Sequence, residues 1–274
     1  MHHDIFLELS LIIAVGAAIA LVMRILHQPL IIGHILTGII VGPSVLALIS
    51  SAETIEVFSK IGIALLLFII GLGLNPRIIR EVGKVTLLAG SAQILLTVGA
   101  GYLVGALFGL TRIESIVLGT ALSFSSTIII LKVLSDKKEQ SRLYGKITIG
   151  ILLVQDIVAT LALLMFTAQS GKDGFAMSQL IDLLIKGILV GGPILLISTF
   201  LLPKMQKLIA GSQEFLFLFS IGWGFGIAAL FDVAGFSLEV GALFAGVALA
   251  SLPYSQEISS RLRPLRDFFV IVFF

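Results

Sequence analysis

The sequence predicts an all-α membrane protein with many spans, and two observations support this fold class. Hydrophobic residues make up 58% of the 274 residues and charged residues only 12%, well below the roughly 25% of charged residues in soluble globular domains. Apolar runs of roughly 20 residues, the length of a helix that crosses a bilayer, recur along the chain. We therefore expect a polytopic transmembrane domain whose partner is the lipid bilayer.

Nine apolar runs approach this length, and each is expected to form one transmembrane helix. They lie at residues 5–23, 30–48, 57–74, 85–108, 113–134, 145–168, 180–202, 214–231 and 237–253. A tenth run opens at Phe268, and the chain stops at Phe274 before that run is long enough to cross a bilayer. We predict about nine complete spans, the start of a tenth, and a domain that is incomplete at its C-terminus.

Lys and Arg concentrate at alternate connections between these runs. The basic connections contain Arg24; Arg77, Arg80 and Lys84; Lys132, Lys137, Lys138, Arg142 and Lys146; Lys204 and Lys207; and Arg261, Arg263 and Arg266. The other connections contain only Lys60, Arg112, Lys172 and Lys186. Because short cytoplasmic loops carry an excess of Lys and Arg, we expect a multi-pass protein of the cell (inner) membrane with its N-terminus outside.

Two segments share a spacing of glycines that indicates an internal repeat. Residues 30–38 align with residues 238–246 at an offset of 208, and the same offset pairs Gly16 with Gly224. A chain with 28 glycines also produces such pairs by coincidence. In the predicted orientation, however, the first copy begins outside and the second begins at the cytoplasmic side. Copies of opposite orientation are inverted-topology repeats, an architecture of many secondary transporters.

The repeat predicts how the transmembrane domain, residues 1–274, is organised. We expect a first repeat at about residues 5–168 and a linker span at about residues 180–202. The start of the second, inverted repeat is expected at about residues 214–274.

One carboxylate lies near the middle of a predicted span. Asp156 belongs to the run at residues 145–168, where a charge costs at least about 2.5–3.5 kcal/mol on insertion scales, so a function facing a cavity is expected. Burial favours the protonated form of a carboxyl group, whereas a bound cation favours the ionised form. One group can thus hold either a proton or a monovalent cation, the minimum chemistry for coupled exchange. The alternative is a structural Asp hydrogen-bonded across helices.

Gln155 immediately precedes Asp156. Its amide can offer a neutral oxygen to a cation, or hydrogen-bond the carboxylate, without adding a titrating proton. Packing between helices is the alternative role. Because the membrane region has one such acid rather than two, we expect one proton to exchange for one monovalent cation, which is electroneutral.

The preceding span has an unusual density of hydroxyl side chains at membrane depth. These are Thr120, Ser123, Ser125, Ser126 and Thr127. Such residues compete with helical hydrogen bonding, and an interrupted helix that lines a cavity exposes carbonyl and hydroxyl oxygens. Hydrogen bonds within an intact helix, or close helix packing, are the alternatives. Beside the Asp156 span we expect an interrupted helix whose oxygens are cation ligands.

Glycines also recur in the third and fourth predicted spans. They are Gly62, Gly71 and Gly73, and Gly99, Gly101 and Gly105. Small residues let transmembrane helices approach closely, so these positions indicate packing rather than chemistry.

The remaining composition narrows the possible functions. The chain has no cysteine, which excludes disulfides, thiolate catalysis and cysteine-ligated zinc. No paired catalytic acids or nucleophile–base pair supports an enzyme, and no basic tract with interleaved aromatics indicates nucleic-acid binding. We expect no cofactor, only K⁺ or Na⁺ and H⁺ as transported ions. Glu239, at the level of the outer interface, is a candidate for the mouth of a cavity or a headgroup contact.

Five segments together carry a specific resemblance. They are residues 33–44, 67–74, 122–127, 154–158 and 237–246. In this order they resemble the cation:proton antiporter-2 family, the group that includes bacterial glutathione-gated potassium efflux antiporters. The resemblance implies thirteen spans, an inverted repeat, a homodimer, and a core domain that moves against a dimerisation domain in an elevator-like cycle.

The resemblance also implies roles for particular residues. Asp156 matches the family's ion- and proton-binding carboxylate, and Gln155 matches the residue before it, which is often Asp or Asn in sodium-selective relatives. Ser125, Ser126 and Thr127 match the unwound part of the first crossing helix. The family often adds a cytoplasmic nucleotide-binding regulatory domain, and nothing within these 274 residues corresponds to it.

The sequence therefore predicts secondary active antiport of a monovalent cation, K⁺ rather than Na⁺, against protons. By the repeat offset, the counterpart of Asp156 would lie beyond Phe274, so we expect the parent protein to exchange cations and this chain alone not to do so. A sodium-coupled solute symporter of similar inverted-repeat design is the alternative, and an intramembrane enzyme or purely structural subunit comes third.

Overall fold

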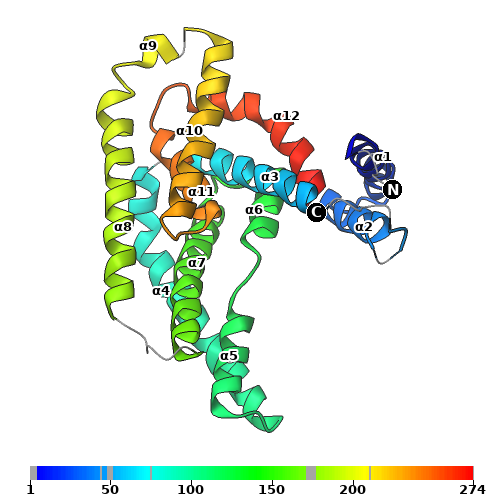
Figure 1. Cartoon of the computed structure of the whole chain (residues 1–274), viewed down its shortest axis with the longest axis vertical. Coiled ribbons are helices and arrows are strands. Elements are labelled where there is room, and N and C mark those ends of the chain that lie inside the picture. The colour runs from blue at the N-terminus through cyan, green and yellow to red at the C-terminus, as the bar shows by residue number, and fades with distance from the viewer. Residues whose placement is uncertain are drawn as a thin grey trace. The chain divides into compact units, whose positions relative to one another are not determined.

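Every regular element that the computed structural model describes is a helix (Figure 1). The described residues are 5–43, 45–47, 52–74, 76–170, 177–209 and 211–273. The helices are α1 (Ile5–Ile25), α2 (Leu30–Val41), α3 (Ala52–Leu72), α4 (Pro76–Leu107), α5 (Arg112–Ser123), α6 (Thr127–Asp136), α7 (Leu143–Ser170), α8 (Met177–Leu196), the π-helix η1 (Ile197–Leu201), α9 (Gln206–Ile209), α10 (Gln213–Val233), α11 (Leu238–Leu249) and α12 (Ser255–Phe273). The predicted all-α class is confirmed.

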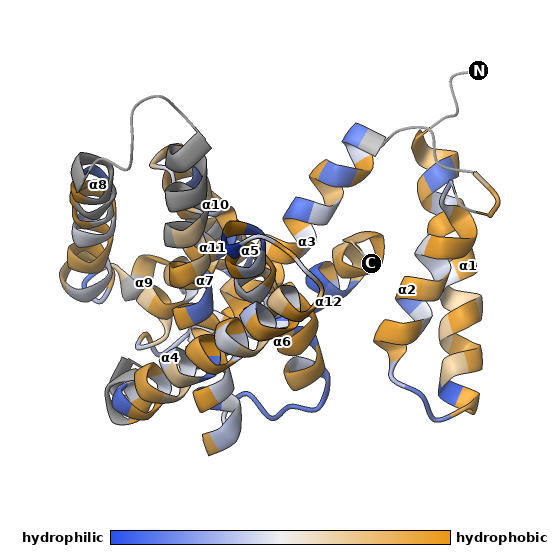
Figure 2. Ribbon diagram, turned by 90° about the horizontal axis from the view of Figure 1, so that it is seen from below, coloured by the Kyte–Doolittle hydropathy of each residue, from blue (hydrophilic) through white to orange (hydrophobic). Residues whose placement is uncertain are grey.

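Several helical stretches are long and apolar enough to cross a bilayer. Within the described residues they are Ile5–Ile25, Glu53–Leu72, Val82–Leu107, Arg112–Asp136 and Gln213–Val233. Figure 2 shows hydrophobic residues along the bodies of the helices and hydrophilic residues mainly at their ends and connections. The chain is therefore a multi-pass membrane protein, while the count of nine spans stays a prediction.

Two of the predicted spans form helices of only 12 residues each, α2 and α11. At 1.5 Å per residue, such a helix is about 18 Å long, shorter than the roughly 30 Å hydrocarbon core. The α2 helix stops because Gly42 takes an extended conformation, with φ −69° and ψ 179°, and Pro43 follows. Hydrophobicity alone did not reveal these early ends, because the apolar runs continue past them.

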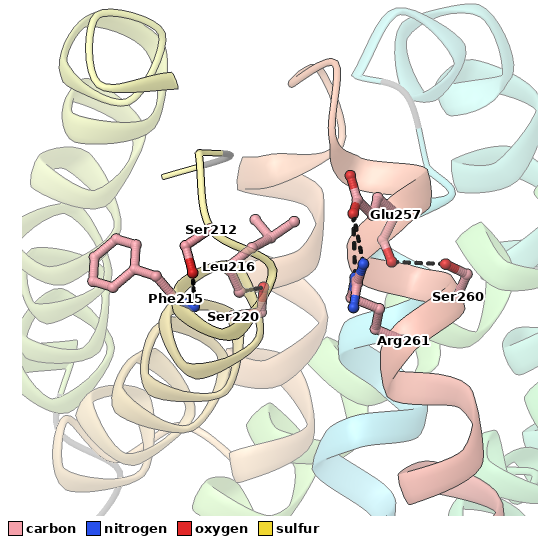
Figure 3. Close-up of polar contacts among 7 residues, drawn as sticks. All are labelled: Ser212, Phe215, Leu216, Ser220, Glu257, Ser260 and Arg261. Carbon is pink, nitrogen blue, oxygen red and sulfur yellow. Dashed lines mark hydrogen bonds and ion pairs between the residues drawn. The ribbon is translucent and has the colours of Figure 1, made fainter. Parts of the chain in front are cut away.

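The last helix begins earlier than the apolar run at Phe268 predicted. It starts at Ser255, and its first turns are polar. Glu257 accepts hydrogen bonds from Arg261 at 3.0 and 3.2 Å, and the backbone carbonyl of Glu257 accepts one from Ser260 at 2.8 Å (Figure 3). Pairs spaced by three or four residues stabilise a helix without hydrophobic residues, so a hydropathy pattern does not detect this part of α12.

The start of α10 has similar local contacts. The hydroxyl of Ser212 accepts a hydrogen bond from the backbone N–H of Phe215 at 3.4 Å, and Ser220 donates to the carbonyl of Leu216 at 2.6 Å (Figure 3). The first contact satisfies one of the free N–H groups at a helix N-terminus. The second keeps a buried hydroxyl bonded inside an apolar helix.

The chain divides into two compact units. Unit 1 consists of residues 1–72, 203–229 and 238–274, and unit 2 of residues 73–202 and 230–237. The two units group helices that contact each other and do not follow the predicted repeat boundaries. The predicted repeats and linker span therefore stay predictions.

Helix α3 forms the core of unit 1. Its residues 62–72 are all buried, as expected for a helix that is apolar on every side. Both α11 and α12 pack against α3, and α1 packs against α2. A Cβ atom on Gly71 would lie 2.9 Å from the Cα atom of Gly246, and one on Gly62 would lie 2.7 Å from the backbone of Phe269. The predicted packing role of these two α3 glycines is confirmed.

The helix bounds in the two predicted repeat segments agree at one offset. The bounds of α10 lie 208 residues after those of α1, and the bounds of α11 lie 208 residues after those of α2. Equal helix and loop lengths at the offset found from the glycines support a repeat. Its inverted orientation stays a prediction.

Helix α4 connects the helices of unit 2, because it packs against both α5 and α7. A Cβ atom on Gly101 would lie 2.5 Å from the Cα atom of Gly119 in α5. One on Gly105 would lie 2.8 Å from the hydroxyl oxygen of Ser115. By contrast, no atom of the described residues lies within 4 Å of the Cβ position on Gly99, so the packing role predicted for Gly99 has no support within the part of the chain that the structure describes.

Candidate functional site

Asp156 and Gln155 lie within the long helix α7 of unit 2. Gln155 is buried, with 4% of its surface exposed, and Asp156 is partly buried. Their neighbours on both sides are apolar. In this setting each polar atom needs a hydrogen-bonding partner, because an unpaired polar group in an apolar environment is costly.

The hydroxyl-rich span is interrupted opposite this pair. Helix α5 ends at Ser123, residues 124–126 have no regular structure, and α6 begins at Thr127. Phe124 is extended, with φ −95° and ψ 144°, and Ser126 caps α6 by accepting a hydrogen bond from the backbone N–H of Ile129 at 3.4 Å. The predicted interrupted helix is confirmed.

Two hydroxyl groups from the interruption reach the polar pair on α7. Thr127 donates to the Oδ1 atom of Asp156 at 3.1 Å, and Ser125 donates to the Oε1 atom of Gln155 at 3.0 Å. Thr127 is the first residue of α6, so the N-terminal end of that helix meets the carboxylate. This end has a partial positive charge that favours a nearby negative group.

A third helix contributes Gln93, a residue that the sequence pattern did not single out. The side-chain amide of Gln155 donates to the Oε1 atom of Gln93 in α4 at 2.7 Å and to the backbone carbonyl of Ser123 at 3.2 Å. Gln93 in turn donates to the same Ser123 carbonyl at 3.1 Å. The carbonyl freed by the helix break therefore accepts hydrogen bonds from two glutamines.

A signal for Gln93 does exist in the sequence. Gly90, Gln93, Thr97 and Gly101 are spaced by three or four residues, which places them on one face of a helix. A Cβ atom placed on Gly90 would contact Val154 of α7, and one placed on Gly101 would contact the backbone of α5. A polar amide between small residues on the packed face of an apolar helix is a candidate for an interhelical hydrogen bond.

Other predicted ligands are bonded within their own helical segments. Thr120 donates to the carbonyl of Ile116 at 2.8 Å, and the hydroxyl of Ser123 donates to the carbonyl of Thr120 at 2.7 Å. Ser126 is the helix cap described above. Of the five hydroxyl residues, Ser125 and Thr127 bond Gln155 and Asp156 through their side chains, and Ser123 bonds Gln155 through its backbone. A role of each in cation binding stays a prediction.

Glu239 is not placed relative to this cluster. It lies in the first turn of α11, in unit 1, and is partly buried. Its predicted position at a cavity mouth therefore stays a prediction.

The side chains in the Asp156 cluster offer oxygen atoms that suit a hard cation. Within the part of the chain that the structure describes, no three His, Cys, Asp or Glu side chains gather as a metal site. Around Asp156 there is instead one carboxylate, hydroxyl oxygens and an amide oxygen, the ligands that hard cations prefer. Binding of a proton or a monovalent cation at Asp156 stays a prediction.

A partly buried carboxylate beside an interrupted apolar helix is typical of one class of protein, the ion-translocating membrane transporters. Within this class, the family model described as "Sodium/hydrogen exchanger, transmembrane" matches residues 10–274. The chain belongs to this family of transporters. The resemblance to monovalent cation:proton antiporters found in the sequence is confirmed.

Similar curated proteins include several cation antiporters. K(+) efflux antiporter 5 of Arabidopsis thaliana is 31% identical over 281 residues, covering 97% of this chain and 48% of the relative. The putative cation/proton antiporter YbaL of Escherichia coli K12 is 28% identical, covering 100% of this chain and 51% of the relative. The glutathione-regulated potassium-efflux system protein KefC of Escherichia coli O7:K1 is 30% identical, covering 89% of this chain and 40% of the relative. The chain spans about half the length of these relatives.

Proposed function

We propose that this chain is part of a monovalent cation:proton antiporter in which Asp156 alternately binds the cation and the proton. The observation that carries this proposal is the contact between Thr127 and Asp156, at 3.1 Å, where an interrupted helix meets the partly buried carboxylate. Membership of the sodium/hydrogen exchanger family supports the same conclusion.

The coupling follows from competition for one carboxylate. When Asp156 is ionised, the hydroxyl of Thr127 and the N-terminal end of α6 stabilise its negative charge, and a cation binds. When a proton binds, the negative charge disappears and the cation leaves. An elevator-like movement of the occupied site then exposes it to the other side, so each direction of movement carries one of the two ions.

The single carboxylate supports a stoichiometry, and the names of the relatives support an ion preference. One carboxylate carries one positive charge per half-cycle, so the exchange of one cation for one proton moves no net charge. K⁺ is proposed as the cation in preference to Na⁺, because relatives that match most of this chain are named as a K⁺ efflux antiporter and as a potassium-efflux system protein. The protein is further proposed to act as a homodimer in the cell (inner) membrane with its N-terminus outside.

A transport assay tests the proposal. The full-length gene product is reconstituted in liposomes that contain a pH-sensitive dye, and lumenal pH is followed after addition of K⁺ or Na⁺. We expect proton movement that depends on the cation and is lost in Asp156→Asn, which keeps the size of the side chain but not its charge. The matched control is Asp182→Asn, because Asp182 is an exposed carboxylate on α8.

Two results would contradict antiport. The first is a wild-type protein that moves no protons with either cation, and the second is full exchange by Asp156→Asn. In either case sodium-coupled solute symport becomes the leading function, and the next assay is uptake of labelled solutes driven by a Na⁺ gradient.

A further inference from the structure

Gln93 lies beside the proposed ion site without bonding the ionisable carboxylate. It is a partly buried residue of α4 that forms hydrogen bonds with Gln155, Ser123 and Thr97. We propose that Gln93 is a positioning residue that sets the cation affinity of the Asp156 site by fixing the side-chain amide of Gln155. This inference rests on the proposed function, since it assigns a second role within the same site.

The argument begins with the hydrogen-bonding capacity of Gln155. An amide nitrogen has two N–H donors. In Gln155 one donates to the Oε1 atom of Gln93 at 2.7 Å and the other to the carbonyl of Ser123 at 3.2 Å. Both donors are used on the α4 and α5 side, so the Oε1 atom of Gln155 must point the other way.

That direction is toward the interruption between α5 and α6. The Oε1 atom of Gln155 accepts a hydrogen bond from Ser125 at 3.0 Å, two residues before Thr127, which contacts Asp156. An oxygen with this orientation adds a partial negative charge next to the proposed ion site. If the amide rotated by half a turn, its two N–H donors would replace the oxygen and repel a cation.

Gln93 is itself held in one orientation. Its amide nitrogen donates to the Ser123 carbonyl at 3.1 Å and to the hydroxyl of Thr97 at 3.3 Å. Thr97 donates its own proton to the backbone carbonyl of Gln93 at 2.8 Å, so its hydroxyl oxygen is available as the acceptor. With both N–H donors used, the Oε1 atom of Gln93 faces Gln155, which fixes the second amide through the first.

A purely structural role is the competing explanation. Gln93 could serve only to satisfy the carbonyl of Ser123 at the helix break, which would make it important for folding and irrelevant to ion affinity. The two roles differ in what they affect: a structural role changes protein yield and thermal stability, whereas a positioning role changes the cation concentration at half-maximal rate.

The test uses Gln93→Met in the full-length gene product. Methionine keeps the length of the side chain but accepts no strong hydrogen bond from Gln155. We expect Gln93→Met to raise the KM for K⁺ about tenfold, the effect of losing one hydrogen bond of typical strength. The maximal rate should change much less.

Thr86→Val is the matched control for packing between α4 and α7. Thr86 lies two turns before Gln93, is 5% exposed, and would contact a side chain placed at Gly150 of α7. Its hydroxyl has no hydrogen-bond partner in the part of the chain that the structure describes, so valine replaces it with nearly the same shape. We expect a wild-type KM in this variant.

A double variant decides whether Gln93 acts through Gln155. In the Gln155→Met background there is no amide to orient, so adding Gln93→Met should leave the KM unchanged. A wild-type KM in Gln93→Met, or an equal rise in KM with and without Gln155, would overturn the proposal.

A binding measurement separates this proposal from the failure of antiport. K⁺ bound to the folded protein raises its thermal midpoint by mass action, and this readout needs no transport. We expect Gln93→Met to require about tenfold more K⁺ than wild type for the same rise. If K⁺ raises the thermal midpoints of the two proteins equally, the proposed role of Gln93 is wrong, even if exchange is observed. If no exchange is observed but the predicted difference in K⁺ binding is present, antiport is contradicted and the role of Gln93 is not.

Discussion

The hydroxyl of Thr127 and the carboxylate of Asp156 are joined by a hydrogen bond of 3.1 Å, although they belong to different helices. Thr127 is at the N-terminal end of α6, directly after the interruption at residues 124–126. The interruption therefore places a donor and a helix N-terminus at the same carboxylate. Both features place partial positive charge beside the carboxylate oxygen.

This contact predicts a shift in the pH dependence of exchange. Thr127→Val removes a donor that stabilises a carboxylate more than a neutral carboxyl group, so we expect K⁺-dependent exchange to begin at higher pH. A hydrogen bond of about 1 kcal/mol corresponds to a shift of about half to one pH unit in the half-maximal rate. The measurement is the K⁺-dependent rate across pH in proteoliposomes. Thr127→Ser keeps the hydroxyl and should retain the wild-type profile; a shift toward lower pH in Thr127→Val would show that the bond stabilises the protonated form.

A second acid beside Asp156 should change the charge moved per cycle. Gln155→Glu adds a carboxylate where wild type has a neutral amide, so two charges are available to bind protons or cations. We expect exchange that responds to an imposed membrane potential, whereas wild-type exchange should not. Initial rates with and without the potential provide the measurement. A strong effect of potential on the wild type would contradict the one-for-one stoichiometry.

The Gln155→Glu variant should also unfold at lower temperature, because an ionised glutamate cannot donate to Gln93 and the Ser123 carbonyl as Gln155 does.

Two glycines of one helix should respond oppositely to the same substitution. In α4, a Cβ atom at Gly101 would lie 2.5 Å from the Cα atom of Gly119. The Cβ position at Gly99 has no neighbour within 4 Å among the residues that the structure describes. Gly101→Ala should therefore separate α4 from α5 and cost about 1–3 kcal/mol, as overpacking does. Gly99→Ala should be neutral or stabilising, since Ala favours a helix over Gly by roughly 1 kcal/mol. Thermal midpoints in detergent give the comparison, and equal midpoints for the two variants would mean that α4 and α5 are not in close contact at Gly101.

The positions of most helices were predictable because lipid imposes a single requirement on each span. An apolar run must satisfy its backbone internally, which only a helix does for a single segment. The runs at residues 5–23 and 214–231 accordingly agree with α1 and α10 to within a few residues. Helix ends were less predictable: Gly42 ends α2 inside an apolar run, and the Glu257–Arg261 pair extends α12 into a polar one.

The candidate site was predictable where polar residues stand out from apolar neighbours. Asp156 and the interruption after Ser123 were identified in this way, and the interruption is present. Gln93 was not, because its contact with Gln155 joins positions 62 residues apart. Which of several polar residues meet depends on how α4 crosses α7, and that crossing is set by small residues such as Gly90 and Gly150 that carry no chemical signal.

Two Lys–Asp pairs with the same spacing should differ in their effect on stability. At the end of α6, the Nζ atom of Lys132 lies 2.7 Å from a carboxylate oxygen of Asp136, and these side chains are 7% and 37% exposed. In α8, the Nζ atom of Lys186 lies 2.6 Å from a carboxylate oxygen of Asp182, and these side chains are 48% and 59% exposed. Removing one partner of a buried pair costs several kcal/mol, whereas exposed pairs contribute about 0–1 kcal/mol. Because Asp136 is itself over a third exposed, we expect Asp136→Asn to cost about 1–3 kcal/mol after screening by solvent.

The comparison with Asp182→Asn separates burial from charge. Both substitutions remove one negative charge from a pair four residues apart, and the lysine is far more deeply buried in the first pair. The aspartate is also less exposed in that pair, and the order of the two residues is reversed. We expect the thermal midpoint of Asp182→Asn to stay near that of wild type and that of Asp136→Asn to fall by several degrees. Adding Lys132→Met to Asp136→Asn should restore part of the loss, because the buried ammonium group is then replaced by an apolar side chain of similar length. Equal midpoints for the two single variants would show that water reaches Lys132 as freely as it reaches Lys186.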